Sequence, residues 1–202
     1  MDPPRPETSK SKLLAAVVDR ALDGGVSQQS LRAIAAAAGT NHRMLLFHFK
    51  SRENLLVEVT REVEARQRRV FEDSLAEVGG TLEEAGSRLW ERLSDPSLHP
   101  QERLFFELYG QALQGRSWAE PLLAGVVENW ARPIREALLA RGVDPDRARD
   151  EARLAVALAR GLLLDLLATG DRAGVDAAMR RYRALSALDP AGPEVSGSGA
   201  VS

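Results

Sequence analysis

The stretch SLRAIAAAAGTNHRMLLFHF, residues 30–49, decides the fold of the amino-terminal part of the chain. Apolar residues recur at helical spacing on both sides of a three-residue turn, Gly39-Thr40-Asn41, and this pattern predicts two short helices. Ala35 is small enough for the helices to cross closely, and Gly39 is suited to a positive φ in the turn. Leu45 supplies the apolar contact from the second helix. The stretch therefore has the layout of a helix-turn-helix.

Outward from this stretch, glycine and proline interrupt segments whose apolar residues follow the helical period. We expect an all-α protein of about nine helices. Pro133 is expected to kink or interrupt the seventh helix near Arg132. The expected helices cover residues 9–23, 31–38, 42–49, 52–78, 82–93, 102–113, 118–141, 147–169 and 172–187.

Composition supports a helical, globular chain. Alanine, leucine and arginine, all strong helix formers, are abundant, whereas aromatic residues make up only 5% of the 202 residues. Hydrophobic residues make up 44% and charged residues 28%, and there is no cysteine. We therefore expect a cytoplasmic protein that needs no oxidising compartment. No apolar stretch is long enough to predict a membrane span or a signal peptide.

The same patterns divide the chain into four parts. Residues 1–8 are expected to be a disordered arm, and residues 9–52 a helix-turn-helix domain. Residues 53–188 are expected to form a second helical domain. Residues 189–202 lack an apolar stripe, which predicts a disordered tail.

Charge is distributed unevenly along the chain. The formal net charge is −2, but residues 1–52 hold eight bases and four acids, a net charge of +4, so the remainder carries −6. This asymmetry indicates that the amino-terminal part faces a polyanion while the rest of the chain does not.

Residues 9 to about 60 resemble the amino-terminal DNA-binding domain of the tetracycline-repressor (TetR) family of bacterial transcriptional regulators. The resemblance rests on a first helix ending in Gly24-Gly25, on SLRAIAAAAG, and on the run MLLFHFKSRENLL that leads into the fourth helix. It implies that residues 9–52 are a DNA-binding domain and that residues 53–188 are an all-helical domain that binds a small-molecule effector and dimerises. It also implies a homodimer formed through the last two long helices.

The resemblance also implies which side chains contact DNA. Arg43 and Arg32 have the head group that bonds guanine O6 and N7, whereas Lys50 and Arg52 would hold phosphates. Many family members have threonine and tyrosine where this chain has Met44 and Leu46, so apolar contacts to thymine methyl groups are expected there. The full set of expected contacts is Ser30, Arg32, Asn41, His42, Arg43, Met44, Leu46, His48, Lys50 and Arg52.

The carboxy-terminal part has no motif of its own, but aromatic residues concentrate between residues 90 and 130. The family resemblance places the walls of an effector cavity in this region. The preferred lining residues are Trp90, Phe105, Tyr109 and Trp130, although an ordinary core position is an equally good interpretation of each. The leucine-rich run at residues 162–167 is apolar over too wide an arc to be covered by its own chain, which favours a homodimer.

The expected function is a ligand-responsive regulator, a repressor that binds a palindromic DNA operator as a homodimer and is released by a small apolar effector. No cofactor, metal site or enzymatic activity is expected, because no phosphate-binding loop, nucleophile elbow, zinc motif or cysteine nucleophile is present. Two alternatives remain open: a helical adaptor that binds proteins and no DNA, and a helical enzyme with scattered catalytic groups. Salt-dependent binding to duplex DNA distinguishes the regulator from both.

Overall fold

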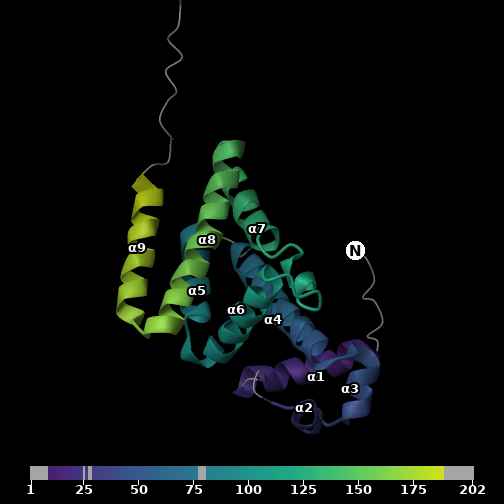
Figure 1. The fold of residues 1–202 in the computed structure, drawn as a ribbon. Helices are drawn as coiled ribbons and strands as arrows, with labels where there is room; N and C mark the ends of the chain where they lie inside the picture. The colour runs from purple at the N-terminus through teal and green to yellow at the C-terminus, as the bar shows by residue number, and fades with distance from the viewer. Residues whose placement is uncertain (1–8, 25, 27–28, 77–80, 189–202) are drawn as a thin grey trace, which may run out of the picture. The chain divides into compact units, whose positions relative to one another are not determined.

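The computed structural model describes residues 9–24, 26, 29–76 and 81–188. Over these residues the chain forms nine α-helices, two short 3-10 helices and no strand, which confirms the all-α prediction. The expected arm at 1–8 and tail at 189–202 lie outside the described residues. The elements in chain order (Figure 1) are α1 (Ser9–Gly24), α2 (Leu31–Ala37), α3 (His42–Phe49), α4 (Arg52–Ala76), α5 (Leu82–Leu93), η1 (Pro96–Leu98), α6 (His99–Leu113), η2 (Glu120–Leu123), α7 (Glu128–Leu139), α8 (Pro145–Thr169) and α9 (Arg172–Leu188).

Contacts divide the chain into two compact units. Unit 1 comprises residues 1–80 and 84–126, and unit 2 comprises residues 81–83 and 127–202. Helices α1 to α4 and α6 therefore belong to one unit, and α7 to α9 to the other. Among the described residues, no helix is both long and apolar enough to cross a membrane.

The core of unit 1 runs without interruption from the helix-turn-helix into α4 and α6. Val17 of α1, Ile34 of α2 and Leu45 of α3 are each at most 2% exposed, and all belong to one apolar cluster. Leu55 and Leu108, from α4 and α6, belong to the same cluster. Burial of this kind stabilises by about 1.5–3 kcal/mol per large side chain, so apolar packing fixes the short helices on the long one.

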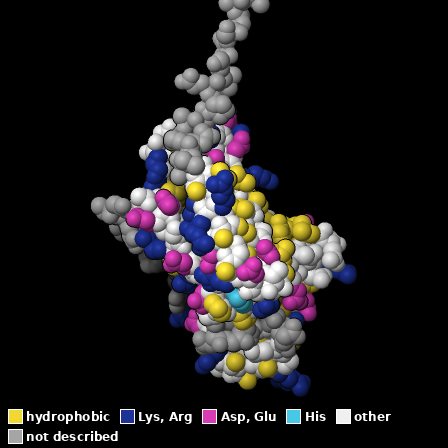
Figure 2. Space-filling model, turned by 90° about the vertical axis from the view of Figure 1, so that its left-hand side faces the viewer, with side chains coloured by type: hydrophobic (Ala, Val, Ile, Leu, Met, Phe, Trp, Pro, Cys, Tyr) yellow, Lys and Arg dark blue, Asp and Glu magenta, His cyan; other side chains and the backbone are white. Residues whose placement is uncertain are grey.

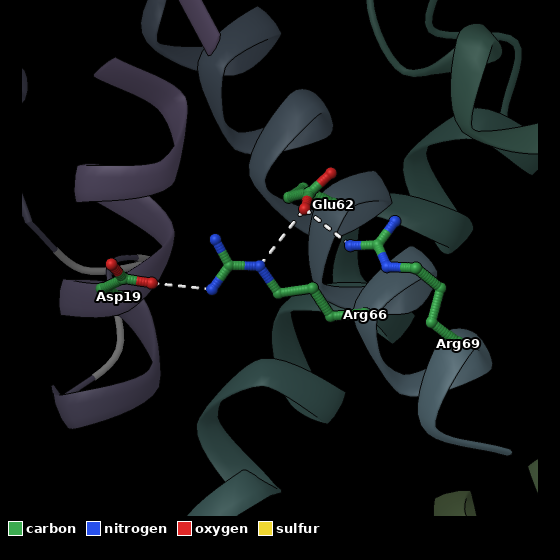
Figure 3. Close-up of polar contacts among 4 residues, drawn as sticks. All are labelled: Asp19, Glu62, Arg66 and Arg69. Atoms are coloured by element: carbon green, nitrogen blue, oxygen red, sulfur yellow. Dashed lines mark hydrogen bonds and ion pairs between the residues drawn. The ribbon is translucent and has the colours of Figure 1, made fainter. Parts of the chain in front are cut away.

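Ion pairs join α1 to α4 at both ends of their contact. Lys10 Nζ lies 2.5 Å from Glu58 Oε1. Toward the other end, Arg66 Nη1 donates to Asp19 Oδ1 at 2.6 Å and Arg66 Nε donates to Glu62 at 3.2 Å, as Figure 3 shows. The hydrogen bond to Asp19 raises the pKa of Arg66 above its ordinary value, against the opposing effect of burial. Because such partly exposed pairs contribute little energy, they orient α1 more than they stabilise it.

The expected helix over residues 118–141 is wrong in its first half. Residues 120–123 form the 3-10 helix η2, and Gly125 has a φ of +72°, which interrupts the backbone before α7 begins at Glu128. Helix α7 then continues through Pro133, so the interruption expected near Arg132 does not occur. Proline removes one intrahelical hydrogen bond, and the packing of α7 against α8 compensates for that loss.

Two other helices begin earlier than expected. Helix α6 begins at His99, directly after η1, because Pro96 and Pro100 each lie in the first turn of a helix, where a missing amide costs nothing. Helix α8 begins at Pro145, and Asp144 caps it by accepting hydrogen bonds from two backbone amides.

Candidate nucleic-acid interface

The turn between α2 and α3 has the geometry that its sequence predicts. Gly39 has a φ of +66°, and the Thr40 amide donates to the Ala35 carbonyl at 2.9 Å. Ala35 is 1% exposed, as required where the two helices cross. Asn41 caps α3, since its Oδ1 accepts a hydrogen bond from the Met44 amide at 3.0 Å. The turn therefore holds the start of α3 in one orientation.

Helix α3 has a buried side and an exposed side. Leu45 and Phe49, four residues apart, are 0% and 2% exposed and pack into the core of unit 1. The opposite side leaves Arg43, Met44 and Leu46 exposed. Arg43 makes no hydrogen bond or ion pair with any described residue, so its guanidinium is available to a ligand.

Phe47 is the residue of this surface that the sequence interpretation missed. Its side chain is 68% exposed, the largest value among the exposed large hydrophobic side chains of the described residues. It lies four residues after Arg43 and three before Lys50, and therefore on the same side of α3. The Lys50 ammonium lies 5.6 Å from its ring centroid. The signal that could have found it was the spacing from Leu45 and Phe49, which places residue 47 on the outer side.

Lys50 ends α3 in an unusual backbone conformation. Its φ is +70° and its ψ is −42°, and it is the only described residue other than glycine with a positive φ. The Ser51 amide donates to the Phe49 carbonyl at 2.9 Å, so Lys50 is the central residue of a strained γ-turn. Its ammonium donates to the Phe47 carbonyl at 3.0 Å and stays exposed beside the aromatic ring.

The remaining expected contacts surround α3, and two of them have a structural role. Arg32 is exposed near the start of α2, and Ser30 caps that helix by accepting from the Ala33 amide at 3.2 Å. Arg52 Nε donates to the Gln29 carbonyl at 2.9 Å, which ties the start of α4 to the segment before α2. Arg52 therefore positions α2 relative to α4, whatever else its guanidinium binds.

The two histidines of α3, His42 and His48, are half-buried, whereas the residues of the outer side around them are exposed. The His48 ring packs edge-on against Phe47, with centroids 5.0 Å apart, and its Nε2 is buried without a hydrogen-bond partner among the described residues. The orientation of His48 thus favours packing over an outward contact, whereas His42 lies in the first turn beside Arg43.

The four aromatic residues expected around an effector are divided between the two units. Trp90, Phe105 and Tyr109 belong to unit 1, and Trp130 belongs to unit 2. Phe105 stacks on Tyr109 with ring centroids 5.5 Å apart. Of the four, only Phe105 lines the cavity of about 10 Å³ that unit 1 encloses between α4 and α6.

Two short helices that cross through a glycine turn, with a buried inner side and a basic outer side, define a helix-turn-helix DNA-binding domain. Comparison with known proteins agrees. Residues 13–59 match the family model of bacterial regulatory proteins, tetR family. The amino-terminal part of the chain thus has the DNA-binding domain of tetR-family bacterial regulatory proteins.

Solved structures show the same fold over most of the chain. A TetR transcriptional regulator from Legionella pneumophila has a TM-score of 0.63 at 17% identity, with 90% of this chain and 98% of that chain covered. A transcriptional regulator from Rhodococcus sp. Rha1 has a TM-score of 0.57 at 23% identity, covering 81% and 86%. The multidrug binding protein EbrR, complexed with proflavin, has a TM-score of 0.55 at 24% identity, covering 85% and 98%. A search of curated protein sequences gave no match.

The backbone at Lys50 generates a stability prediction. Because glycine adopts a positive φ at no steric cost, Lys50→Gly should have a free energy of unfolding about 1 kcal/mol higher than Lys50→Ala. Urea denaturation measures both. Arg43 is the control, since it lies inside α3: there the alanine variant should be the more stable by about 1 kcal/mol. The same order at both positions would contradict the strained turn.

Proposed function

We propose that this regulator is a repressor that binds a palindromic operator as a homodimer and is released by a small, mainly apolar effector. The observation that carries the proposal is the outer side of α3, where exposed basic and apolar side chains lie opposite a fully buried inner side. Residues 9–52 would bind DNA, and residues 53–188 would bind the effector and dimerise.

In this proposal α3 enters the major groove, where an α-helix fits and base edges differ in their hydrogen-bonding pattern. Arg43 reads guanine with two hydrogen bonds, and Met44, Leu46 and Phe47 contact thymine methyl groups. Lys50 holds a phosphate, which adds affinity without reading sequence. Arg32 provides a second basic group at the edge of the groove.

The support for a homodimer comes from α8. Its buried side, including Val156, Leu163 and Leu166, packs within unit 2. A second side of α8 is exposed and apolar at alternating spacings of three and four residues, the pattern of a helix that packs against another helix. This seam consists of Leu154, Ala157, Gly161, Leu164 and Ala168.

Gly161 is the most informative residue of the seam. A methyl group added there would meet no atom within 4 Å, so nothing in the chain itself requires glycine. Glycine inside a helix costs about 1 kcal/mol relative to alanine. The close approach of a second helix would explain why glycine is nevertheless present at this position. Neighbouring α9 is also lined by small exposed residues, including Ala177 and Ala178. Figure 2, viewed from the α9 side, shows hydrophobic side chains exposed among basic ones.

The support for an effector is twofold. EbrR, which shares the fold, is complexed with proflavin, and unit 1 of this chain has a cavity against α4, the helix that directly follows the recognition helix. The effector would bind more tightly to the protein conformation that fits the operator poorly. It would then weaken operator binding by a coupling free energy of about 1–3 kcal/mol, or roughly 5- to 150-fold.

The DNA-binding proposal predicts different losses for two basic residues. Arg43→Ala should cost about 1–3 kcal/mol on the cognate duplex and relax base preference at one position. Lys50→Ala should weaken all duplexes alike and reduce the slope of log affinity against log salt by about one. Fluorescence anisotropy over a salt series measures both. Arg116→Ala, an exposed arginine beyond α6, is the control and should bind as wild type. Unchanged affinity and base preference in Arg43→Ala would refute the assignment of α3.

The dimer proposal predicts that Gly161→Leu separates the protomers. A leucine side chain at the closest approach of two helices overpacks the seam, and the resulting cost of about 1–3 kcal/mol raises the dimer Kd roughly 5- to 150-fold. Sedimentation equilibrium measures the Kd. Arg149→Leu adds the same side chain to an exposed position of α8 outside the seam and should leave the Kd unchanged. Wild-type protein that is monomeric at micromolar concentration would refute the homodimer.

A further inference from the structure

We propose that the outer side of α3 recognises the C5-methyl group of pyrimidines and does not distinguish thymine from 5-methylcytosine. DNA binding would then depend on the methylation state of cytosine. The inference rests on the proposed function, in which α3 enters the major groove, and it deepens that function by naming the chemical group that is recognised. It is carried by the composition of the exposed residues of α3.

Half of α3 is exposed, and most of that half is apolar. Of its eight residues, four are exposed: Arg43, Met44, Leu46 and Phe47. The three apolar side chains are 38%, 40% and 68% exposed, in chain order. Isolated apolar residues on a surface are ordinary, whereas three within about one turn of a short helix form a patch that fits a ligand with apolar groups.

The apolar side chains of this patch lie on both sides of the one exposed charge of α3. At about 100° per residue, the order around the helix axis is Leu46, Arg43, Phe47 and Met44, over an arc of about 160°. The opposite side of α3 is buried in the core of unit 1. The bases beside the one that Arg43 bonds would therefore meet apolar atoms.

The major groove offers one apolar group to such side chains. Thymine has a methyl group at C5 there, whereas adenine, guanine and cytosine are recognised by their hydrogen-bond donors and acceptors. The base 5-methylcytosine carries the same methyl group on the same ring atom. An apolar side chain that covers the C5 position therefore gains the same contact from thymine and from 5-methylcytosine.

The outer side of α3 lacks the acceptor that would identify cytosine. Thymine and 5-methylcytosine differ at C4, where thymine has an accepting oxygen and cytosine a donating amino group. Helix α3 contains no aspartate, glutamate, asparagine or glutamine. Asn41, which precedes the helix, uses its side-chain oxygen as the cap. Arg43 only donates and is assigned to guanine, so the methyl group is the shared feature left to the patch.

Phe47 presents the largest exposed fraction of the patch, and two contacts hold its ring. The His48 ring lies edge-on to it with centroids 5.0 Å apart, and the Lys50 ammonium lies 5.6 Å from its centroid. A ring that is already held loses less conformational entropy on binding than a free one. Because Lys50 is assigned to a phosphate, Phe47 would lie beside the DNA backbone, on the side of the groove where pyrimidine C5 atoms lie.

The experiment compares duplexes that differ by single methyl groups, using full-length protein and fluorescence anisotropy at one salt concentration. The starting duplex is the operator selected from a random DNA pool. Deoxyuridine replaces thymine at each position in turn, which removes only the C5-methyl group. Where uracil weakens binding, the T·A pair is then replaced by a C·G pair and by a 5-methylcytosine·G pair, which again differ by one methyl group.

We expect two effects of equal size at the same positions. Removing the methyl group from thymine should raise the Kd about fourfold, the factor that corresponds to the burial of one methyl group. Adding the methyl group to cytosine should lower the Kd about fourfold. The same change in both half-sites of a palindrome should give about 16-fold.

Variants test whether the patch on α3 causes these ratios. Met44→Gln and Leu46→Asn nearly keep the side-chain shape and remove the apolar end, and Phe47→Ala removes the ring. Each should bring the ratio close to one at the pyrimidine that the residue covers. Leu113→Asn is the matched control, because it makes the same change as Leu46→Asn at a side chain that is 67% exposed at the end of α6, and it should leave every ratio unchanged.

Three results would overturn the inference: equal Kd values for thymine and uracil at every position, no effect of cytosine methylation where uracil weakens binding, or unchanged ratios in all three variants. Each of them leaves DNA binding itself in place, and so leaves the proposed function standing. Absence of binding to any duplex would instead refute the proposed function, and the inference with it.

Discussion

Burial of the inner side of α3 is the constraint on which the rest of the structure depends. Leu45 and Phe49 are held in a core that α1, α2 and α4 share, and rotating α3 about its axis would expose one or both of them. The outer side is therefore fixed as well, with Arg43 and Phe47 exposed. Replacing Leu45 by a smaller residue would act on DNA binding only through this packing, because Leu45 itself reaches no ligand. The apolar contacts of Leu45 and Phe49 therefore determine which side chains of α3 are exposed on its outer side.

Helix α4 extends this constraint through unit 1. Its first residue, Arg52, bonds the backbone before α2, and Glu58 and Arg66 hold α1 by ion pairs. One helix of 25 residues thus contacts α1 and the segment before α2, and its residues Thr60 and Gln67 line the cavity against α6. A ligand in the cavity and DNA on α3 would be coupled through this helix, and the coupling would be reciprocal.

The helix-turn-helix was predictable because its determinants are local. Gly39, Ala35, the cap at Asn41 and the pair Leu45 and Phe49 all lie within one stretch, and each has the conformation or burial that its residue type indicates. All nine α-helices were expected. Their predicted boundaries were wrong near proline and glycine residues, which can either end a helix or lie in its first turn. Residues 118–127 have the apolar pattern of an α-helix, but they form a 3-10 helix followed by a turn at Gly125.

The candidate site was only partly predictable, because side-chain contacts depend on packing between distant segments. The spacing of α3 gives the outer positions of Arg43 and Phe47, but the contacts expected from the family resemblance did not include Phe47. The structural bonds of Arg52 and the strained φ of Lys50 depend on how α3 meets α4, and no local pattern reveals them. The polar cavity requires residues 60–67 and 101–102 to meet, and their separation in sequence hides it. The four aromatic residues remain a prediction for the effector, with Phe105 alone at the described cavity.

Selection of bound duplexes from a random DNA pool by the full-length protein tests the central claim most directly. The account predicts enrichment of a palindrome whose two half-sites are separated by about one helical turn or a multiple of it, since a two-fold dimer presents two copies of α3. Arg43→Ala should lose the preference for guanine at one position of each half-site. The account would be contradicted if no sequence were enriched. It would also be contradicted if a variant protein with the exposed residues of α3 replaced enriched the same sequence as the wild type.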